Sequence, residues 1–407
     1  MLKYKYSILI LAQYFPPDMG GAATRAYNAA KGLKLIGCKI TVVAAFPHYP
    51  NGNIPKKYRW KPLVFETHEG IHIIRTIVPP LESKGILRRL ILFISFIISS
   101  LFPLLTLRKA DVILAMNPNI IVFFPAYIYS KIKKIPLILN ADDLWPEELV
   151  NTGLLKENSI IIRIAEKIAQ IAYRKADLIT PISPGYVRII SLKYGVRPSK
   201  IKVIRGGVDI SKFKKITKKK REKFTVLYIG AFSIAYDFDQ VLLAAKKLEK
   251  YSDIEFILQG GGELKKYIKK KARELNLKNV RIIDKVVSRQ QVAEILSNAD
   301  VLLLPLRDFG KPYLGISSKL YEYQAAGKPI ICCAIGQPAK YITMTKSGIV
   351  VKPGDYNAIS RAILYLKNNE KEASKMGING RNYVYKHVSI EAIGKKFYNC
   401  ICSLLSK

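Results

Sequence analysis

The chain has 407 residues, of which 49% are hydrophobic and 24% are charged, so its composition is unlike that of a disordered protein. Its length exceeds what one hydrophobic core usually supports, and two domains are therefore expected. The 67 Lys and Arg residues against 30 Asp and Glu residues give a net charge of +37. Such a surface predicts an anionic partner, but nucleic acid, anionic lipid and phosphorylated substrates all satisfy the charge.

Short apolar runs, each followed by a turn and a longer helical pattern, recur along the chain. They begin at residues 7, 40, 71, 111, 136, 178 and 201 in the first half, and at 225, 255, 280, 300, 329 and 348 in the second. This alternation predicts an α/β fold with parallel sheets. We expect two Rossmann-like, doubly wound parallel-sheet domains that face each other across a cleft, with ligands at the carboxyl ends of the strands.

A basic stretch, FKKITKKKREKF at 213–224, separates the two series and is too highly charged for a core. A solvated linker is the commoner meaning of such a stretch, although it could also contact lipid or nucleic acid. We therefore expect an N-terminal Rossmann-like domain at 1–215, a linker at 216–223 and a C-terminal Rossmann-like domain at 224–388. A last helix at 389–407 could cross back to the first domain.

The cysteines fit neither a zinc site nor a disulfide framework, and we expect buried thiols in a reducing compartment. They are Cys38, Cys332, Cys333, Cys400 and Cys402. The apolar run that begins at Ser7 is too short for a signal sequence and is expected to form the first strand. Both observations favour a cytoplasmic protein.

An apolar run of 18 residues without charge, 90–107, has two basic residues on each side. As a helix it spans roughly 27 Å, close to the thickness of a bilayer core. A single crossing would place strands of one sheet on opposite sides of the membrane, so it is excluded. A core helix and an interfacial helix remain. Because the run is apolar and the protein is basic, we favour a membrane-associating segment at 86–107, peripheral or monotopic at the inner face of the cell membrane.

Glycines follow several expected strands where a helix begins. Gly20 and Gly21 follow the first strand, Gly230 follows the run at 225, and Gly261 lies within a triplet after the run at 255. Glycine lets backbone N–H groups approach a phosphate at a helix N-terminus. A tight turn explains Gly20 and Gly21 at least as well and is the favoured interpretation of the triplet that contains Gly261, and the G-x-G-x-x-G fingerprint is absent. We take these four glycines as candidates for donor binding.

The stretch 305–333 is the most informative. Gly315, Ser317 and Ser318 open an expected helix beside Lys319, a set of hydroxyls, N–H donors and a cation that suits a diphosphate. Glu322 lies about one turn further on, where its carboxylate could accept both hydroxyls of a ribose. A surface Lys-Glu pair is the alternative.

Acceptor-side candidates come from the first half. Asp142 and Asp143 precede a Trp-Pro turn and could orient an acceptor hydroxyl or act as a base. A lone acidic pair is weak evidence for a metal, and no histidine has ligand spacing, so no metal is expected. Arg25, His48 and Trp145 are also expected on the acceptor side, although His48 could be an ordinary loop histidine.

Several motifs, in the same order, resemble glycosyltransferase family 4. The branch most similar is that of transferases of N-acetylated fucosamine and related sugars in surface polysaccharide synthesis. The motifs are DMGGAATR, DLWPEELVNTG from Asp143, SPGYVRII from Ser183, IRGGVDISKF from Ile204, SKLYEYQAAGKPII from Ser318 and MGINGRNYV from Met376. The resemblance implies a GT-B fold and metal-independent transfer with retention at the anomeric carbon. It also implies that the nucleoside diphosphate sugar binds mainly to the second domain, 224–388, which makes the first domain, 1–215, the acceptor side.

The resemblance also implies roles for single residues. Glu322 matches the ribose ligand of the family, Ser317 to Lys319 the phosphate-contacting stretch, and Gly20 and Gly21 the first-domain donor loop. The first glutamate of the family falls on Leu314, and the Arg and Lys usual after Gly230 are replaced. The first-domain histidine is missing, with the two aspartates in its neighbourhood. Lys319 is therefore expected to supply charge to the diphosphate during catalysis.

These observations predict a retaining glycosyltransferase. The sugar, an N-acetylated hexosamine or deoxyhexosamine, would pass from a nucleoside diphosphate, UDP in preference to GDP, to a lipid-linked glycan, without a further cofactor. One alternative is a nucleotide-sugar 2-epimerase, which the membrane-type run disfavours. Another is a nucleic-acid binder. No zinc module, aromatic RNA-binding strand or basic recognition helix accompanies the charge, so no nucleic-acid partner is expected.

Overall fold

The computed structural model describes residues 4–49, 51–82, 85–117, 119–151, 155–213, 222–285, 287 and 289–406. The chain divides into two compact units. Unit 1 comprises Met1–Gly207 and Ile390–Lys407, and unit 2 comprises Val208–Ser389. Of the expected linker at 216–223, only residues 222 and 223 lie within the described residues.

Unit 1 is built on a seven-stranded sheet of order β3-β4-β2-β1-β5-β6-β7. All neighbouring strands are parallel except β3 and β4, which are antiparallel. The strands are β1 (Ser7–Ala12), β2 (Lys39–Ala45), β3 (Leu63–His68), β4 (Ile71–Thr76), β5 (Val112–Asn117), β6 (Leu137–Ala141) and β7 (Leu178–Pro181). The central strands are buried on both faces, which explains why they are continuous apolar runs in the sequence.

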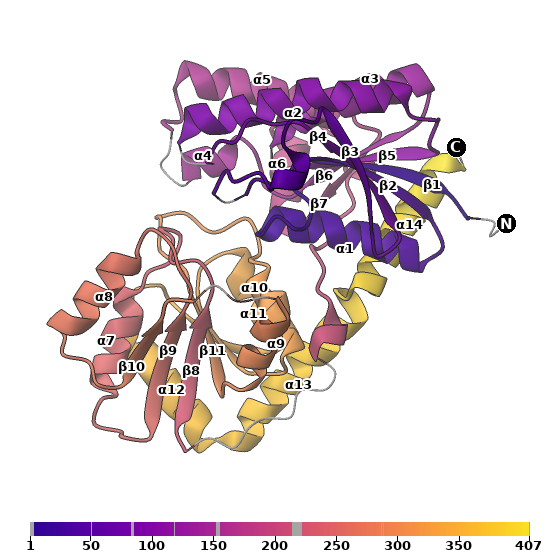
Figure 1. Cartoon of the computed structure of the whole chain (residues 1–407). Helices are drawn as coiled ribbons and strands as arrows, with labels where there is room; N and C mark the ends of the chain where they lie inside the picture. The colour runs from indigo at the N-terminus through magenta and orange to yellow at the C-terminus, as the bar shows by residue number, and fades with distance from the viewer. Residues whose placement is uncertain are drawn as a thin grey trace. The chain divides into compact units, whose positions relative to one another are not determined.

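Helices cover both faces of this sheet (Figure 1): α2, α3 and α5 lie together on one side, and α1 and α14 on the other. The helices of unit 1 are α1 (Gly21–Leu35), α2 (Ile86–Thr106), α3 (Phe123–Lys133), α4 (Glu147–Asn151), α5 (Ile160–Lys175), α6 (Pro184–Leu192) and α14 (Ile390–Leu405), with short 3-10 turns η1 (Lys56–Tyr58), η2 (Ile120–Val122) and η3 (Pro198–Lys200). The last segment of the chain therefore belongs to the core of unit 1, where Ile393, Phe397 and Ile401 are buried.

Unit 2 has a six-stranded parallel sheet of order β10-β9-β8-β11-β12-β13. Its strands are β8 (Phe224–Ile229), β9 (Ile254–Gln259), β10 (Val280–Ile283), β11 (Val301–Pro305), β12 (Ile330–Cys333) and β13 (Gly348–Val351). Its helices are η4 (Ile210–Phe213), α7 (Asp239–Lys247), α8 (Lys265–Glu274), α9 (Arg289–Ser297), α10 (Lys319–Ala325), α11 (Gln337–Thr345), α12 (Tyr356–Asn368) and α13 (Glu370–His387). Two doubly wound α/β units confirm the expected fold class, while the cleft between them stays a prediction.

Two strand assignments differ from the sequence analysis. The run at 201 does not form a strand, because Ile201 makes only a single bridge to Ile179. The seventh strand of the sheet is instead β3, an antiparallel edge strand. Helix α2 continues through Pro103 as far as Thr106. It is long and apolar enough to cross a membrane, and 28% of its most apolar window is buried.

Helices α1 and α14 approach closely where a glycine of each meets the other. A Cβ atom added to Gly394 would lie 2.4 Å from the carbonyl carbon of Gly32, and one added to Gly32 would lie 2.5 Å from the oxygen of Ile390. Any larger side chain must separate the two backbones, and so the pair fixes how the C-terminal helix packs on unit 1.

We therefore expect Gly394→Val to destabilise unit 1. Overpacking of this kind costs about 1–3 kcal/mol, which lowers the Tm by roughly 2–4 °C for each kcal/mol. Thermal unfolding followed by circular dichroism measures the effect. Lys395→Ala, at the exposed neighbouring position, is the matched control. An unchanged Tm for Gly394→Val would contradict the close packing of the two helices.

Candidate functional site

The candidate residues of unit 1 gather at the carboxyl edge of its sheet. Gln13 follows β1, His48 follows β2, Asn119 follows β5 and Asp142 follows β6. Because these four strands are parallel, their carboxyl ends meet at one edge, the usual ligand-binding edge of a doubly wound sheet. The Nδ2 of Asn119 donates to the Oε1 of Gln13 at 2.9 Å, which links the loops after β1 and β5.

The loop between β1 and α1 carries the expected glycines. Gly20 has φ +118°, a conformation that favours glycine, and a Cβ there would lie 3.2 Å from the Tyr49 ring. Gly21 begins α1, whose N-terminus has no side-chain cap. The first N–H groups of this helix therefore point out of it without a capping side chain, which suits an anionic group.

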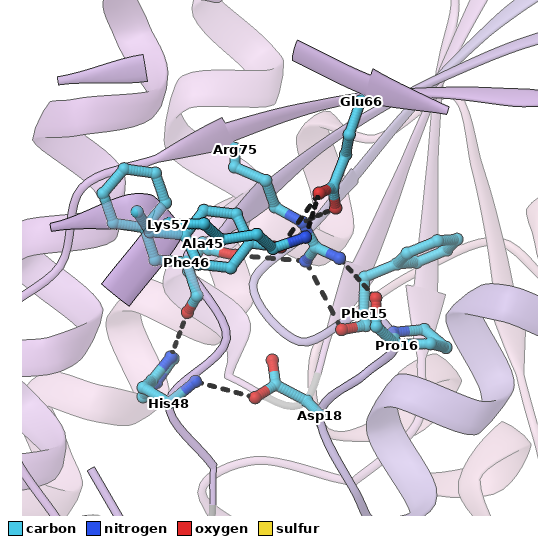
Figure 2. A network of polar contacts seen from close by, with 10 residues as sticks. Phe15, Pro16, Asp18, Ala45, Phe46, His48, Lys57, Glu66 and Arg75 are labelled. Carbon is cyan, nitrogen blue, oxygen red and sulfur yellow. Dashed lines mark hydrogen bonds and ion pairs between the residues drawn. The ribbon is translucent and has the colours of Figure 1, made fainter. Parts of the chain in front are cut away.

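Asp18 and His48 form one polar pair at this edge (Figure 2). The Oδ1 of Asp18 accepts the backbone N–H groups of His48 and Tyr49, each at 2.8 Å. The Nδ1 of His48 lies 2.7 Å from the carbonyl oxygen of Phe46. Since a carbonyl only accepts, Nδ1 carries a proton in this contact. Burial raises the pKa of Asp18 above its ordinary range.

Four buried polar atoms at this edge have no hydrogen-bond partner among the described residues: the Oδ2 of Asp18, the Nε2 of His48, the Nε2 of Gln13 and the Oδ2 of Asp142. Buried polar atoms are usually paired with protein or ordered water. His48 is itself buried, so it belongs to the floor of this region and not to an exposed loop.

Arg75 on β4 holds these loops together and is a residue that the sequence analysis missed (Figure 2). Its guanidinium is fully buried and donates to the Oε1 of Glu66 at 2.7 Å. It also donates to the carbonyl oxygens of Phe15, Pro16 and Ala45. The available signal was a lone basic residue within the apolar run IHIIRTIV.

Asp142, Asp143 and Arg25 come together, a contact that the sequence analysis did not predict for Arg25. The Nε of Arg25 lies 2.9 Å from the Oδ1 of Asp142, and its Nη2 lies 4.0 Å from Asp143. Asn140 also donates to Asp142, at 2.7 Å. The side chain of Asp142 is fully buried, whereas that of Asp143 is 47% exposed. Asp143 is therefore the carboxylate that a substrate can reach.

The surroundings of this acidic group shift several pKa values. Burial raises the pKa of Asp142 to about 6, although the charge of Arg25 opposes the shift. Burial, with the charge of Asp143, raises the pKa of Glu148 to about 7. Burial lowers the pKa of Arg25, but the two aspartates hold it above its ordinary value. Glu148, which the sequence analysis did not single out, thus titrates near neutral pH. Trp145 follows Asp143 by two residues and precedes a cis proline.

One glycine turn of unit 2, at Gly230, lies against Lys319. A Cβ at Gly230 would lie 2.2 Å from the Cε of Lys319, so this side chain occupies the space that the glycine leaves. The Nζ of Lys319 lies 5.1 Å from the ring centroid of Tyr236, a cation–π distance. Gly260 packs against the carbonyl of Gly230, where no Cβ would fit. Gly261 is the open member of its triplet.

Lys319 is the first residue of α10, directly after the partly buried Ser317 and Ser318. Glu322 lies in the first turn of this helix and is also partly buried. Gly315 belongs to the preceding loop. The structure thus places the expected phosphate and ribose candidates around one helix start. Their roles stay predictions. Among the described residues, no three His, Cys, Asp or Glu side chains gather as metal ligands would.

Two family models match the chain. The model of glycosyltransferase family 4 matches residues 19–212, and that of glycosyl transferases group 1 matches residues 209–383. The 2-deoxystreptamine N-acetyl-D-glucosaminyltransferase of Niallia circulans is 28% identical over 39% of this chain and 40% of its own length. WcaI of Escherichia coli strain K12, which is described as a colanic acid biosynthesis glycosyl transferase, is 22% identical over 97% of this chain and 99% of its own length.

A solved structure has the same fold. Anabaena HepE, in complex with UDP and glucose, matches 98% of this chain and 100% of its own with a TM-score of 0.68 and 16% identity. HepE and related structures are GT-B glycosyltransferases, and the two-unit α/β architecture of this chain is of that type.

We expect Asp142→Asn to change how stability depends on pH. The native pKa of Asp142 is about 6, against roughly 3.9 in an unfolded chain. The native protein therefore binds a proton that the unfolded chain releases, and stability falls as pH rises from about 4 to 6, by an amount on the order of 2 kcal/mol. Asparagine cannot ionise, so the Tm of the variant minus that of the wild type should rise over this interval. A constant Tm difference would contradict this environment for Asp142.

Proposed function

Because the chain belongs to glycosyltransferase family 4, we propose that it transfers a sugar from a nucleoside diphosphate to a lipid-linked glycan in the synthesis of a cell-surface glycan. The observation that carries this proposal is the pair of family matches, which together cover residues 19–383. WcaI, similar over nearly its whole length and named for colanic acid biosynthesis, supports the acceptor class. The Niallia circulans enzyme, named for N-acetyl-D-glucosaminyl transfer, supports an N-acetylated hexosamine or deoxyhexosamine as the sugar.

The donor half of the reaction is assigned to unit 2. Lys319 and the N–H groups beside Ser317 and Ser318 suit the diphosphate, and Glu322 suits the ribose hydroxyls. UDP is proposed in preference to GDP, in keeping with the UDP bound in the HepE structure. The nucleotide sugar is a co-substrate, and the proposal includes no other cofactor.

Retention and metal independence follow from the family resemblance and belong to the proposal. In this mechanism the bond between the anomeric carbon and the departing phosphate breaks, and a bond from the anomeric carbon to the acceptor oxygen forms on the same face of the sugar. The departing phosphate takes the proton of the acceptor hydroxyl. Lys319 and backbone N–H donors stabilise the charge that develops on the phosphate. The side chain of Lys319 lies against Gly230 and near the rings of Tyr228 and Tyr236.

The acceptor half is assigned to unit 1. Asp143 is exposed enough to accept a hydrogen bond from a substrate hydroxyl, and Arg25 fixes its neighbour Asp142. Glu148, with a pKa near 7, can change its protonation during turnover.

Membrane association is the second part of the proposal, and helix α2 supports it. The exposed apolar side chains of α2 are Leu87, Leu90, Ile91, Ile94, Ile98, Phe102 and Leu105, whose spacing places them along one side of the helix. The opposite side, with Leu92, Phe96, Ser100 and Leu104, is buried. Neighbouring α5 adds exposed isoleucines at 160, 161, 164 and 171. Such a surface with basic flanks suits the interface of an anionic membrane at the cytoplasmic face.

Donor binding is tested by thermal stabilisation. We expect UDP or a UDP-sugar to raise the Tm, because a ligand that binds only the native state at 100 times its Kd stabilises it by about 2.7 kcal/mol. GDP and GDP-mannose are the comparison ligands. Glu322→Ala should abolish the shift, while Glu370→Ala, exposed in the same unit, should retain it. No shift with any nucleotide would remove the support for a nucleotide-sugar donor.

Membrane association is tested by sedimentation with vesicles that contain phosphatidylglycerol. We expect Ile94→Glu with Ile98→Glu to lower the bound fraction at least tenfold, since a buried carboxylate at an interface is costly. Both side chains are exposed, so folding should persist. Ile378→Glu is the matched control, because Ile378 is 55% exposed in unit 2, close to the 65% of Ile98. Equal binding by both variants would contradict a role for α2.

A further inference from the structure

A second feature of unit 1 also suits a membrane, the loop of residues 55–61, PKKYRWK, which we name the Trp60 loop. Trp60 is 99% exposed and has φ +63°, an uncommon conformation for a bulky residue. An isolated apolar side chain on a surface needs no explanation, but a fully exposed indole in this backbone conformation does. The side chain of Trp60 is therefore not buried by any other part of the described structure.

The loop beneath the indole is well fixed. The backbone N–H of Arg59 donates to Lys56 and that of Lys61 donates to Tyr58. Tyr58 is fully buried, lies 5.2 Å from Phe46 between ring centroids and donates its hydroxyl to Glu66 at 2.9 Å. Glu66 in turn pairs with the buried Arg75. Trp60 is therefore presented to solvent by an anchored turn.

The charge of the loop is entirely positive. Lys56, Lys57, Arg59 and Lys61 are exposed, four cations within six residues. The Nζ of Lys57 lies 3.2 Å from the Oε2 of Glu66, and Arg75 forms an ion pair with the same carboxylate. An indole among lysines and arginines is the composition found at a membrane interface, where the ring occupies the headgroup level and the cations meet anionic lipid.

The Trp60 loop lies at the same edge of the sheet as the acceptor candidates. Leu63, the first residue of β3, pairs with Thr76, the last residue of β4. The loop therefore precedes β3 at the carboxyl end of β4. A Cβ added to Gly52 would lie 2.5 Å from the backbone of Leu81, so the chain before the loop packs on the segment that leads into α2. The exposed Leu87 and Arg88 begin that helix.

We propose that the Trp60 loop is a second membrane contact, in which Trp60 enters the headgroup region and its cations bind anionic lipid. This inference rests on the proposed membrane association but on different residues from α2. The contact turns the carboxyl edge of the unit 1 sheet toward the bilayer. An acceptor anchored by its lipid then presents its headgroup to that edge, close to the loops that Arg75 holds (Figure 2).

Tryptophan fluorescence tests the proposal, because the chain has only two tryptophans, Trp60 and Trp145. We expect the wild-type emission to shift to shorter wavelength with phosphatidylglycerol vesicles and to remain in place with phosphatidylcholine alone. Trp60→Phe, which leaves Trp145 as the reporter, should lose the shift. Trp145→Phe should retain it, and the difference between wild type and Trp60→Phe gives the same information if Trp145→Phe fails to fold.

Sedimentation of the same samples separates the possible failures. Trp60→Ala should lower vesicle binding several-fold, while Tyr385→Ala, exposed in unit 2, should leave it unchanged. Binding without any shift of Trp60 emission would overturn this inference and leave the membrane association standing. Absence of binding would overturn both, and the donor stabilisation would still test the transferase. A shift with heparin but not with vesicles would assign the loop to a soluble polyanion and overturn the proposal.

Discussion

The carboxyl edge of unit 1 depends on one buried guanidinium. A charge removed from water is costly unless it is paired and its N–H groups are hydrogen-bonded. Arg75 meets this requirement with the carboxylate of Glu66 and with carbonyl oxygens from the end of β2 and from the loop after β1. The loop that leads to Gly20 and α1 is therefore held by a residue on another strand. A candidate phosphate loop and the anchored Trp60 loop share this single support.

Burial gives the two adjacent aspartates different chemistry. Asp142 is fully enclosed, pairs with Arg25 and accepts from Asn140, so its position orders the residues around it. Asp143 points to a more open region and keeps an exposed carboxylate. The positive charge of Arg25 offsets the negative charges of the two aspartates. The pKa of Glu148 is about 7, so this side chain titrates near neutral pH. In the proposed reaction, the enclosed Asp142 orients the residues around it, and the exposed Asp143 binds the acceptor. The sequence alone, in which the two aspartates are adjacent, does not reveal this difference.

Much of the fold could be predicted from the sequence, because strands buried on both faces are continuous apolar runs and glycines mark their ends. The run at 201 has the same pattern, but only Ile201 reaches a neighbouring strand. Strand β3 was missed because LVFETH lies at an edge and is half polar. The grouping of Lys319 with Gly230 and Tyr236, and the role of Arg75, depend on contacts between segments distant in sequence. No local pattern encodes such contacts.

The two kinds of substrate in the proposed reaction fit the chemistry of the two units. A lipid-linked acceptor is confined to the membrane plane, whereas a nucleotide sugar diffuses in solution. Unit 1 carries the exposed apolar side of α2, the basic Trp60 loop and the acidic acceptor candidates. Unit 2 carries the glycine turns, Lys319 and Glu322, which suit a soluble diphosphate. The large positive charge of the chain then serves both substrates, because it attracts anionic lipid as well as the phosphates of the nucleotide.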